Sequence, residues 1–307
     1  MKLLDLLKNT AIYLLTAARL EWLPSYVVHL TYGPKQLMHY HSNRKREWSA
    51  PLSAILVDNP SSISDSAAYL TACNLALNSE EAFSRFKSEK SYKEILEHTG
   101  YRFGSDYLRV LRERAFEIPR DFIFQQSRIG DPETFSFEGL GEISPSALRY
   151  LKVGSDLDMF FPDWKSRKII EVGVGYGGQL CALKELGHNG EYVGVDLKQV
   201  SILARKYATA SGFESGYNFL GFEEPLPSST GHLFLSNYAF SELAPEHQAF
   251  YVDKYICTSS SGYVSWNRLA ELSLGGMTAE ELRRIVKGQI VNEEPLTHPG
   301  NCLVIWG

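Results

Sequence analysis

The hydrophobic and polar positions change their pattern at about residue 168. Beyond it, short apolar runs alternate with longer segments in which apolar residues recur at helical spacing. The runs predict strands at residues 168–172, 191–196, 217–220, 232–235, 262–266, 289–292 and 302–306. The longer segments predict helices at residues 177–186, 199–210, 246–256 and 278–286. Such alternation is typical of a parallel sheet with helices on both faces, so we predict an α/β domain at residues 155–307.

The last two predicted strands, 289–292 and 302–306, are joined by a short loop that contains Pro295 and Pro299. Parallel neighbours need a long crossover connection, whereas antiparallel neighbours can be joined by a short loop. We therefore expect a Rossmann-like sheet of seven strands that ends in a closing antiparallel hairpin. Six-stranded dinucleotide-binding folds lack this hairpin.

Helical spacing dominates before residue 155. It predicts helices at residues 65–78, 80–98, 105–116 and 144–151. A looped segment with Pro119 and Pro132 separates the last two. Residues 1–30 also have helical spacing, but charged residues such as Asp5 interrupt them, and no apolar run approaches the ~18–20 residues of a membrane span. We predict that residues 1–154 form a mainly α-helical N-terminal segment that caps the α/β domain.

Composition adds limits on partners and compartment. The chain has 307 residues, 44% hydrophobic residues and a formal net charge of -5. This length suits one large domain or two smaller ones, and the acidic balance argues against nucleic acid as a partner. The scattered cysteines (Cys73, Cys181, Cys257 and Cys302) form no C-x-x-C pair, as expected for thiols in a reducing, cytoplasmic compartment. The oligomeric state stays open.

A glycine cluster follows the first strand of the α/β domain. Gly173, Gly175 and Gly178 have the G-x-G-x-x-G spacing, which lets a ligand approach the backbone closely and lets a helix pack near the strand. Asp196 ends the next strand, about 20 residues further on, where an acid can accept hydrogen bonds from ribose hydroxyls. A glycine turn and a strand-end acid together predict a nucleoside site.

Glu171, two residues before the first glycine, bears on which nucleoside binds. A pyrophosphate would lose affinity beside this carboxylate, whereas an ammonium or sulfonium would gain affinity. The run EVGVGYGG at 171–178 resembles motif I of class I S-adenosylmethionine (SAM)-dependent methyltransferases, in which the acid lies close to the amino group of the cofactor. We expect SAM as the cofactor. An NAD(P)-dependent oxidoreductase and a non-catalytic nucleotide-binding scaffold remain as alternatives.

A narrower resemblance comes from three segments of the sequence. They are SPSALRY at 144–150, LSNYAFSEL at 235–243 and NCLVIWG at 301–307. Together they resemble a family of sugar O-methyltransferases over about residues 83–307. The resemblance implies SAM-dependent methylation of a hydroxyl on a sugar, nucleotide sugar or glycan, in the biosynthesis of surface polysaccharides. Another small-molecule acceptor is the alternative within this reaction class.

The motifs and the resemblance assign residues to the site. Ligands of open α/β sheets bind at the carboxyl ends of the strands. The expected cofactor contacts are Tyr150, Glu171, Gly173, Gly175, Tyr176, Gly177, Gly178, Asp196 and Asn237. We expect Arg149 to face an acidic group or the acceptor, and Tyr238 and Phe240 to stack on a sugar ring.

The acceptor's proton needs a base, because a sugar hydroxyl is a poor nucleophile at neutral pH. His298 in the final hairpin and Glu242 after the fourth strand lie on the cofactor side, so we expect one or both to act as catalytic base. His188 and His232 precede strands and are expected to be structural. No set of Asp, Glu and His has an evident metal-ligand spacing, so no metal is predicted.

Overall fold

The computed structural model describes residues 67–224, 229–268, 270–271 and 276–307. The helix expected within residues 1–30 lies outside these ranges.

A seven-stranded sheet forms the centre of the molecule, in the order β5-β4-β3-β6-β7-β9-β8. The strands are β3 (Ile169–Val172), β4 (Tyr192–Asp196), β5 (Tyr217–Gly221), β6 (Leu233–Asn237), β7 (Ser261–Trp266), β8 (Gln289–Asn292) and β9 (Cys302–Trp306). The first five pair in parallel, and β9 pairs antiparallel with both β7 and β8. The predicted α/β sheet and its closing hairpin are therefore confirmed.

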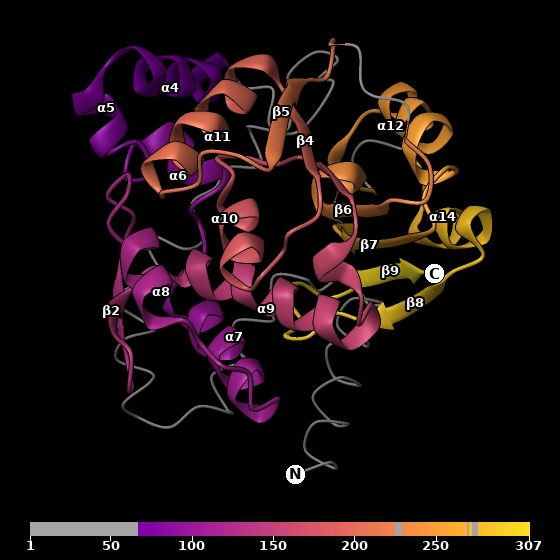
Figure 1. The fold of residues 1–307 in the computed structure, drawn as a ribbon, viewed down its shortest axis with the longest axis horizontal. Helices are drawn as coiled ribbons and strands as arrows, with labels where there is room; N and C mark the ends of the chain where they lie inside the picture. Colours follow the sequence, from indigo (N-terminus) through magenta and orange to yellow (C-terminus); the bar gives the residue numbers. More distant parts are fainter. Residues whose placement is uncertain (1–66, 225–228, 269, 272–275) are drawn as a thin grey trace, which may run out of the picture.

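Helices cover both faces of this sheet (Figure 1). One face packs against α9 (Pro145–Phe160), α10 (Gly178–Glu185) and α11 (Lys198–Ala210). The other packs against α12 (Pro245–Tyr251), the π-helical turn η4 (Val252–Ile256) and α14 (Ala279–Val286). Neighbouring residues of a strand point to opposite faces, so Ile169 lies in one hydrophobic cluster and Ile170 in the other. Both faces are apolar, which explains the continuous apolar runs in the sequence.

The helical part that precedes the sheet differs in detail from the prediction. Its helices are α4 (Ala67–Asn78), α5 (Glu80–Ser84), α6 (Lys90–Ile95), α7 (Tyr101–Glu113) and α8 (Arg120–Gln126). The helix expected at 80–98 is two helices, because Glu89 caps α6 with its side chain and restarts the chain there. The segment expected as a loop contains α8 and a hairpin of β1 (Phe135–Phe137) and β2 (Gly141–Ile143).

Helix α9 joins the helical part to the sheet. The helix expected at 144–151 continues to Phe160, where Pro162 prevents a longer helix. It therefore runs through the expected domain boundary between residues 154 and 155. Side chains from both sides of that boundary belong to one hydrophobic cluster, and a Cβ atom at Gly154 would lie 2.2 Å from Cδ1 of Leu186.

A buried charged network reinforces this junction. The carboxylate of Asp156 in α9 accepts hydrogen bonds from Arg114 Nη1 at 2.6 Å and Lys152 Nζ at 2.7 Å. Tyr263 in β7 donates a third, at 2.6 Å. Asp156 is 1% exposed, so these donors replace the water that its charge would otherwise hold. The network ties the end of α7, α9 and the sheet together.

Candidate functional site

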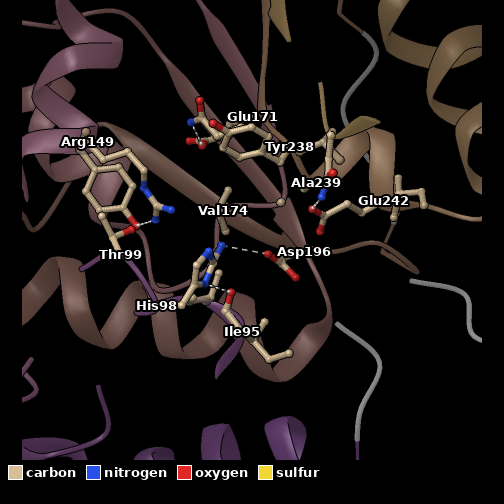
Figure 2. Close-up of a pocket in the computed structure, with 18 of the residues that line it drawn as sticks. Ile95, His98, Thr99, Arg149, Glu171, Val174, Asp196, Tyr238, Ala239 and Glu242 are labelled. Carbon is tan, nitrogen blue, oxygen red and sulfur yellow. Dashed lines mark hydrogen bonds between the residues drawn. The ribbon is translucent and has the colours of Figure 1, made fainter. Parts of the chain in front are cut away.

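A cavity of about 540 Å³ lies at the carboxyl ends of β3, β4 and β6 (Figure 2). The loop between α6 and α7 lines it with Leu96, His98 and Thr99, so the helical part covers the strand ends. Leu96 lies against the glycine loop, with Cδ1 3.0 Å from where a Cβ of Gly175 would be. Ligand sites of open α/β sheets have this location.

The glycine loop that follows β3 forms one wall of the cavity. Gly173, Gly175 and Gly177 have φ angles of +81°, +52° and +85°, in the left-handed region that side chains disfavour. A Cβ at Gly173 would lie 2.0 Å from Cβ of Ala239, so the loop packs directly on the segment after β6. A Cβ at Gly178 would meet the ring of Tyr150 at 2.4 Å. Gly178 thus allows helix packing rather than ligand approach.

A buried carboxyl group and an amide lie side by side beneath this loop. Glu171 is 1% exposed, and burial raises its pKa to about 8, although hydrogen bonds from Tyr192 and Asn237 oppose the rise. Asn237 Nδ2 is 3.4 Å from Glu171 Oε1 and 3.3 Å from Gln179 Oε1. Asn237 Oδ1 is buried and has no hydrogen-bond partner in the described part of the chain. The pair therefore offers acceptors to a cationic donor.

Asp196 is held in a fixed orientation at the end of β4. Its Oδ2 accepts a hydrogen bond from the Gly175 N–H at 2.9 Å, and its Oδ1 accepts one from the Leu197 N–H at 2.7 Å. An apolar region lies beside it, lined by Leu197, Phe222 and Tyr251. The carboxylate and this apolar surface suit the sugar and the base of a nucleoside.

The other half of the cavity is polar and contains Glu242. Oε1 of Glu242 accepts a hydrogen bond from Asn267 Nδ2 at 2.9 Å. Burial raises the pKa of Glu242, while Asn267 and the charge of Arg149 oppose the rise. His298 also lines the cavity, and its Nδ1 donates to the carbonyl of Pro299 at 2.9 Å.

Tyr238 lies between these two halves. Its φ of +68° is unusual for a residue with a side chain and directs the ring into the cavity. The hydroxyl donates to the buried carboxyl group of Glu293, which comes from the turn between β8 and β9. Thr297 donates to the same carboxyl group from its N–H at 2.9 Å and its hydroxyl at 2.6 Å. Glu293 carried no signal in the sequence, because only the folded hairpin brings it to Tyr238.

The structure brings most of the expected site residues together. Those that line the cavity are Arg149, Tyr150, Glu171, Gly173, Gly175, Asp196, Asn237, Tyr238, Glu242 and His298. His98 and Asn267 also line it and were missed from the sequence. Asn267 follows β7 and so lies at a strand end, which was a usable signal.

Four of the expected site residues do not line the cavity, and the first is Gly178, which packs on the ring of Tyr150. Phe240 is fully buried between Phe234 and Trp266, so it does not reach a ligand. Tyr176 is 2% exposed and packs against Tyr150 and Tyr207 rather than lining the cavity. Gly177 is the N-cap of α10 and does not line the cavity, and a Cβ atom there would lie 3.2 Å from the backbone oxygen of Ala204.

Neither a metal site nor a membrane-spanning helix is found in the described ranges. No group of three or more His, Cys, Asp and Glu side chains in these ranges has a geometry that could hold a metal ion. None of the helices there combines the length and apolarity that crossing a membrane requires.

Comparison with known proteins finds similarity at the level of the fold. No protein-family model matches the sequence, and no curated protein matches it. A solved SAM-dependent methyltransferase from Aquifex aeolicus is 18% identical over 52% of this chain and 96% of its own, with a TM-score of 0.36. The mitomycin 7-O-methyltransferase is 14% identical over 83% and 74%, with a TM-score of 0.42.

An O-methyltransferase from neocarzinostatin biosynthesis, solved with SAM and a naphthoic acid, is 16% identical over 52% of this chain and 57% of its own, with a TM-score of 0.37. Sequence identities this low indicate similarity of fold only and say nothing of activity or acceptor. The strand order of the chain itself carries the assignment, because five parallel strands are followed by an antiparallel β8–β9 hairpin inserted beside β7. The chain has the Rossmann-like α/β fold of class I SAM-dependent methyltransferases, preceded by a mainly helical segment.

Proposed function

We propose that the chain binds SAM and transfers its methyl group to a hydroxyl of a sugar or glycan. The observation that carries the proposal is the unpartnered Asn237 Oδ1 beside the carboxyl group of Glu171. A buried acceptor without a donor costs free energy, and the ammonium of a methionine moiety would satisfy it. Glu171 would balance the charge of that ammonium.

The remaining cofactor contacts follow from the order of the strands. Asp196 would accept hydrogen bonds from the two ribose hydroxyls, and the apolar region of Leu197, Phe222 and Tyr251 would hold the adenine. Tyr150 lies near the glycine loop, where it would contact the methionine part. SAM, when bound, supplies an electrophilic methyl group on a sulfonium.

The polar half of the cavity would hold the acceptor. Glu242 is the proposed base, because burial raises its pKa and Asn267 fixes its orientation. It would take the proton from the acceptor hydroxyl at Oε2 while Oε1 stays on Asn267. His298, which also lines the cavity, is the second proposed base. The enzyme's own contribution is then orientation of the hydroxyl and removal of its proton.

A sugar acceptor is supported by the chemistry of the lining. Tyr107, Tyr238, Asn267, Thr297 and Asn301 bring hydroxyl and amide groups to the same half of the cavity. Protein partners hold these groups in place, and their oxygens can accept further hydrogen bonds from the several hydroxyls of a sugar. The resemblance of 235–243 to sugar O-methyltransferases supports the same acceptor.

Binding to the cofactor product S-adenosylhomocysteine (SAH) tests the proposal. Calorimetry should show that wild-type protein binds SAH more tightly than NAD. Asp196→Ala should weaken SAH binding by about tenfold to a hundredfold, because it removes two hydrogen bonds worth about 1–3 kcal/mol in all. Asp163→Asn, an exposed change outside the cavity, is the control and should bind like wild type. Tighter binding of NAD, or unchanged SAH binding by Asp196→Ala, would contradict the proposal.

A further inference from the structure

Arg149 presents a guanidinium group to the cavity from the first turns of α9 (Figure 2). Its hydrogen-bond partner is the hydroxyl of the neighbouring Tyr150, at a long 3.4 Å, and it also lies 5.2 Å from that ring's centre. None of the ion pairs found in the described ranges includes Arg149. A half-buried cation thus faces the cavity without an ion-pair partner among the described residues.

The electrostatic neighbours of Arg149 place it in the acceptor half. Burial raises the pKa of Glu242 and of Tyr107, and the charge of Arg149 opposes the rise at both groups. The pKa of Glu171 is raised by burial and modulated by Tyr192, Asn237 and Asp196, with no contribution from Arg149. Burial lowers the pKa of His98 and the charge of Arg149 lowers it further, so the guanidinium lies among Glu242, Tyr107 and His98.

A cation without an ion-pair partner in the described residues can bind an anion from outside the chain. The cofactor would bring a sulfonium to the same cavity, and two positive charges close together repel unless a negative charge lies between them. Glu242 is not within ion-pair distance, and its carboxylate is oriented by Asn267. Guanidinium groups bind carboxylates and phosphates through paired, charge-assisted hydrogen bonds.

We propose that the acceptor carries an anionic group, a carboxylate or a phosphate, which Arg149 binds while Glu242 receives the hydroxyl. The inference rests on the proposed function and narrows its acceptor to acidic sugars or sugar phosphates. Arg149 would orient the acceptor and would also exclude neutral sugars, since a neutral group would leave the guanidinium without a counter-charge.

Binding to matched sugars tests this proposal in SAH-saturated full-length protein. Glucuronate and glucose differ by one carboxylate, and glucose 1-phosphate and methyl glucoside differ by one phosphate. Calorimetry should show that at least one anionic sugar binds at least tenfold more tightly than its neutral twin, in line with a charged hydrogen bond of about 1.5–3 kcal/mol. Comparison of the two anionic sugars distinguishes carboxylate from phosphate recognition.

Arg149→Gln should abolish the preference for the anionic sugar, and Arg149→Lys should retain part of it. Arg109→Gln, an exposed change in α7, is the matched control and should leave the preference intact. Thermal unfolding and SAH affinity show that each variant is folded. The inference is wrong if neither anionic sugar binds wild type, if the neutral twin binds equally well, or if Arg149→Gln retains the preference.

Two results separate this inference from the proposed function. If wild type does not bind SAH, the proposed function itself fails. If Arg149→Gln weakens SAH binding but not the binding of 5′-methylthioadenosine, which lacks the amino acid part, Arg149 holds the cofactor's own carboxylate. That second result would overturn the acceptor role while leaving the cofactor assignment intact.

Discussion

Replacement of Glu171 by glutamine gives a test with a calculable pH dependence. Burial raises the pKa of this carboxyl group to about 8 in the unliganded protein. At pH 7 only about one molecule in ten then carries the charge, and ionising the rest costs about 1.4 kcal/mol. An ammonium binds the ionised form, so affinity should be lost as the pH falls below 8. Each pH unit should weaken wild-type binding of SAH by about tenfold.

Glu171→Gln keeps the shape of the side chain and removes this titration. Between pH 6 and pH 7.5 its affinity for SAH should stay nearly constant while that of wild type rises. The two proteins should bind similarly at pH 6, where Glu171 is protonated, and wild type should bind about tenfold to a hundredfold more tightly at pH 8. Calorimetry in buffers of different ionisation enthalpy should also detect about one proton released per SAH bound at pH 7. A flat wild-type profile, or an equal slope in Glu171→Gln, would refute the reasoning.

Three other outcomes are expected. Glu242→Gln or His298→Ala should lower the single-turnover rate of methyl transfer by about 10²–10⁴ with SAH affinity nearly unchanged, and wild-type rates in both would exclude both as base. Lys87 is buried against Tyr207, and burial lowers its pKa to about 8. In the unfolded protein the same lysine stays protonated to a higher pH, so the free energy of unfolding rises with pH in this range. Wild type should therefore gain about 2 kcal/mol in unfolding free energy relative to Lys87→Met between pH 7.5 and 9.5, and denaturant titrations that show no gain would refute this. Asp156→Ala should cost about 3–5 kcal/mol in urea unfolding, because Lys152 and Arg114 lose their buried partner, and a loss under 1 kcal/mol would count against the network.

Local sequence patterns were sufficient for the sheet and for the half of the cavity that is formed by the glycine loop and Asp196. A buried parallel strand is a continuous apolar run, and the turn after β3 needs glycine where φ is positive. Both features can therefore be recognised from residues that are adjacent in the sequence. Asp196 could be predicted in the same way, because a polar residue that ends an apolar parallel strand lies at the carboxyl end of that strand. These features do not depend on distant contacts.

The half of the cavity around Glu242 depended on contacts that no local pattern encodes. Tyr238 and Phe240 were expected to act together on a sugar ring. The left-handed backbone at Tyr238 instead starts a 3-10 turn, η3 (Ala239–Glu242), which sends Tyr238 to the cavity and Phe240 into the core. Glu293 reaches Tyr238 only through the closing hairpin. Both facts need the packed tertiary structure.

Helix α9 links the unfolding of the helical part to the unfolding of the sheet. It supplies Leu148 and Leu157 to a cluster that also contains residues of α7 and of the sheet, and its Asp156 joins the same elements by charge. A cut anywhere within 145–160 would leave the helical part and the sheet each with an incomplete interior. The helical part and the sheet of the described ranges are therefore expected to unfold together.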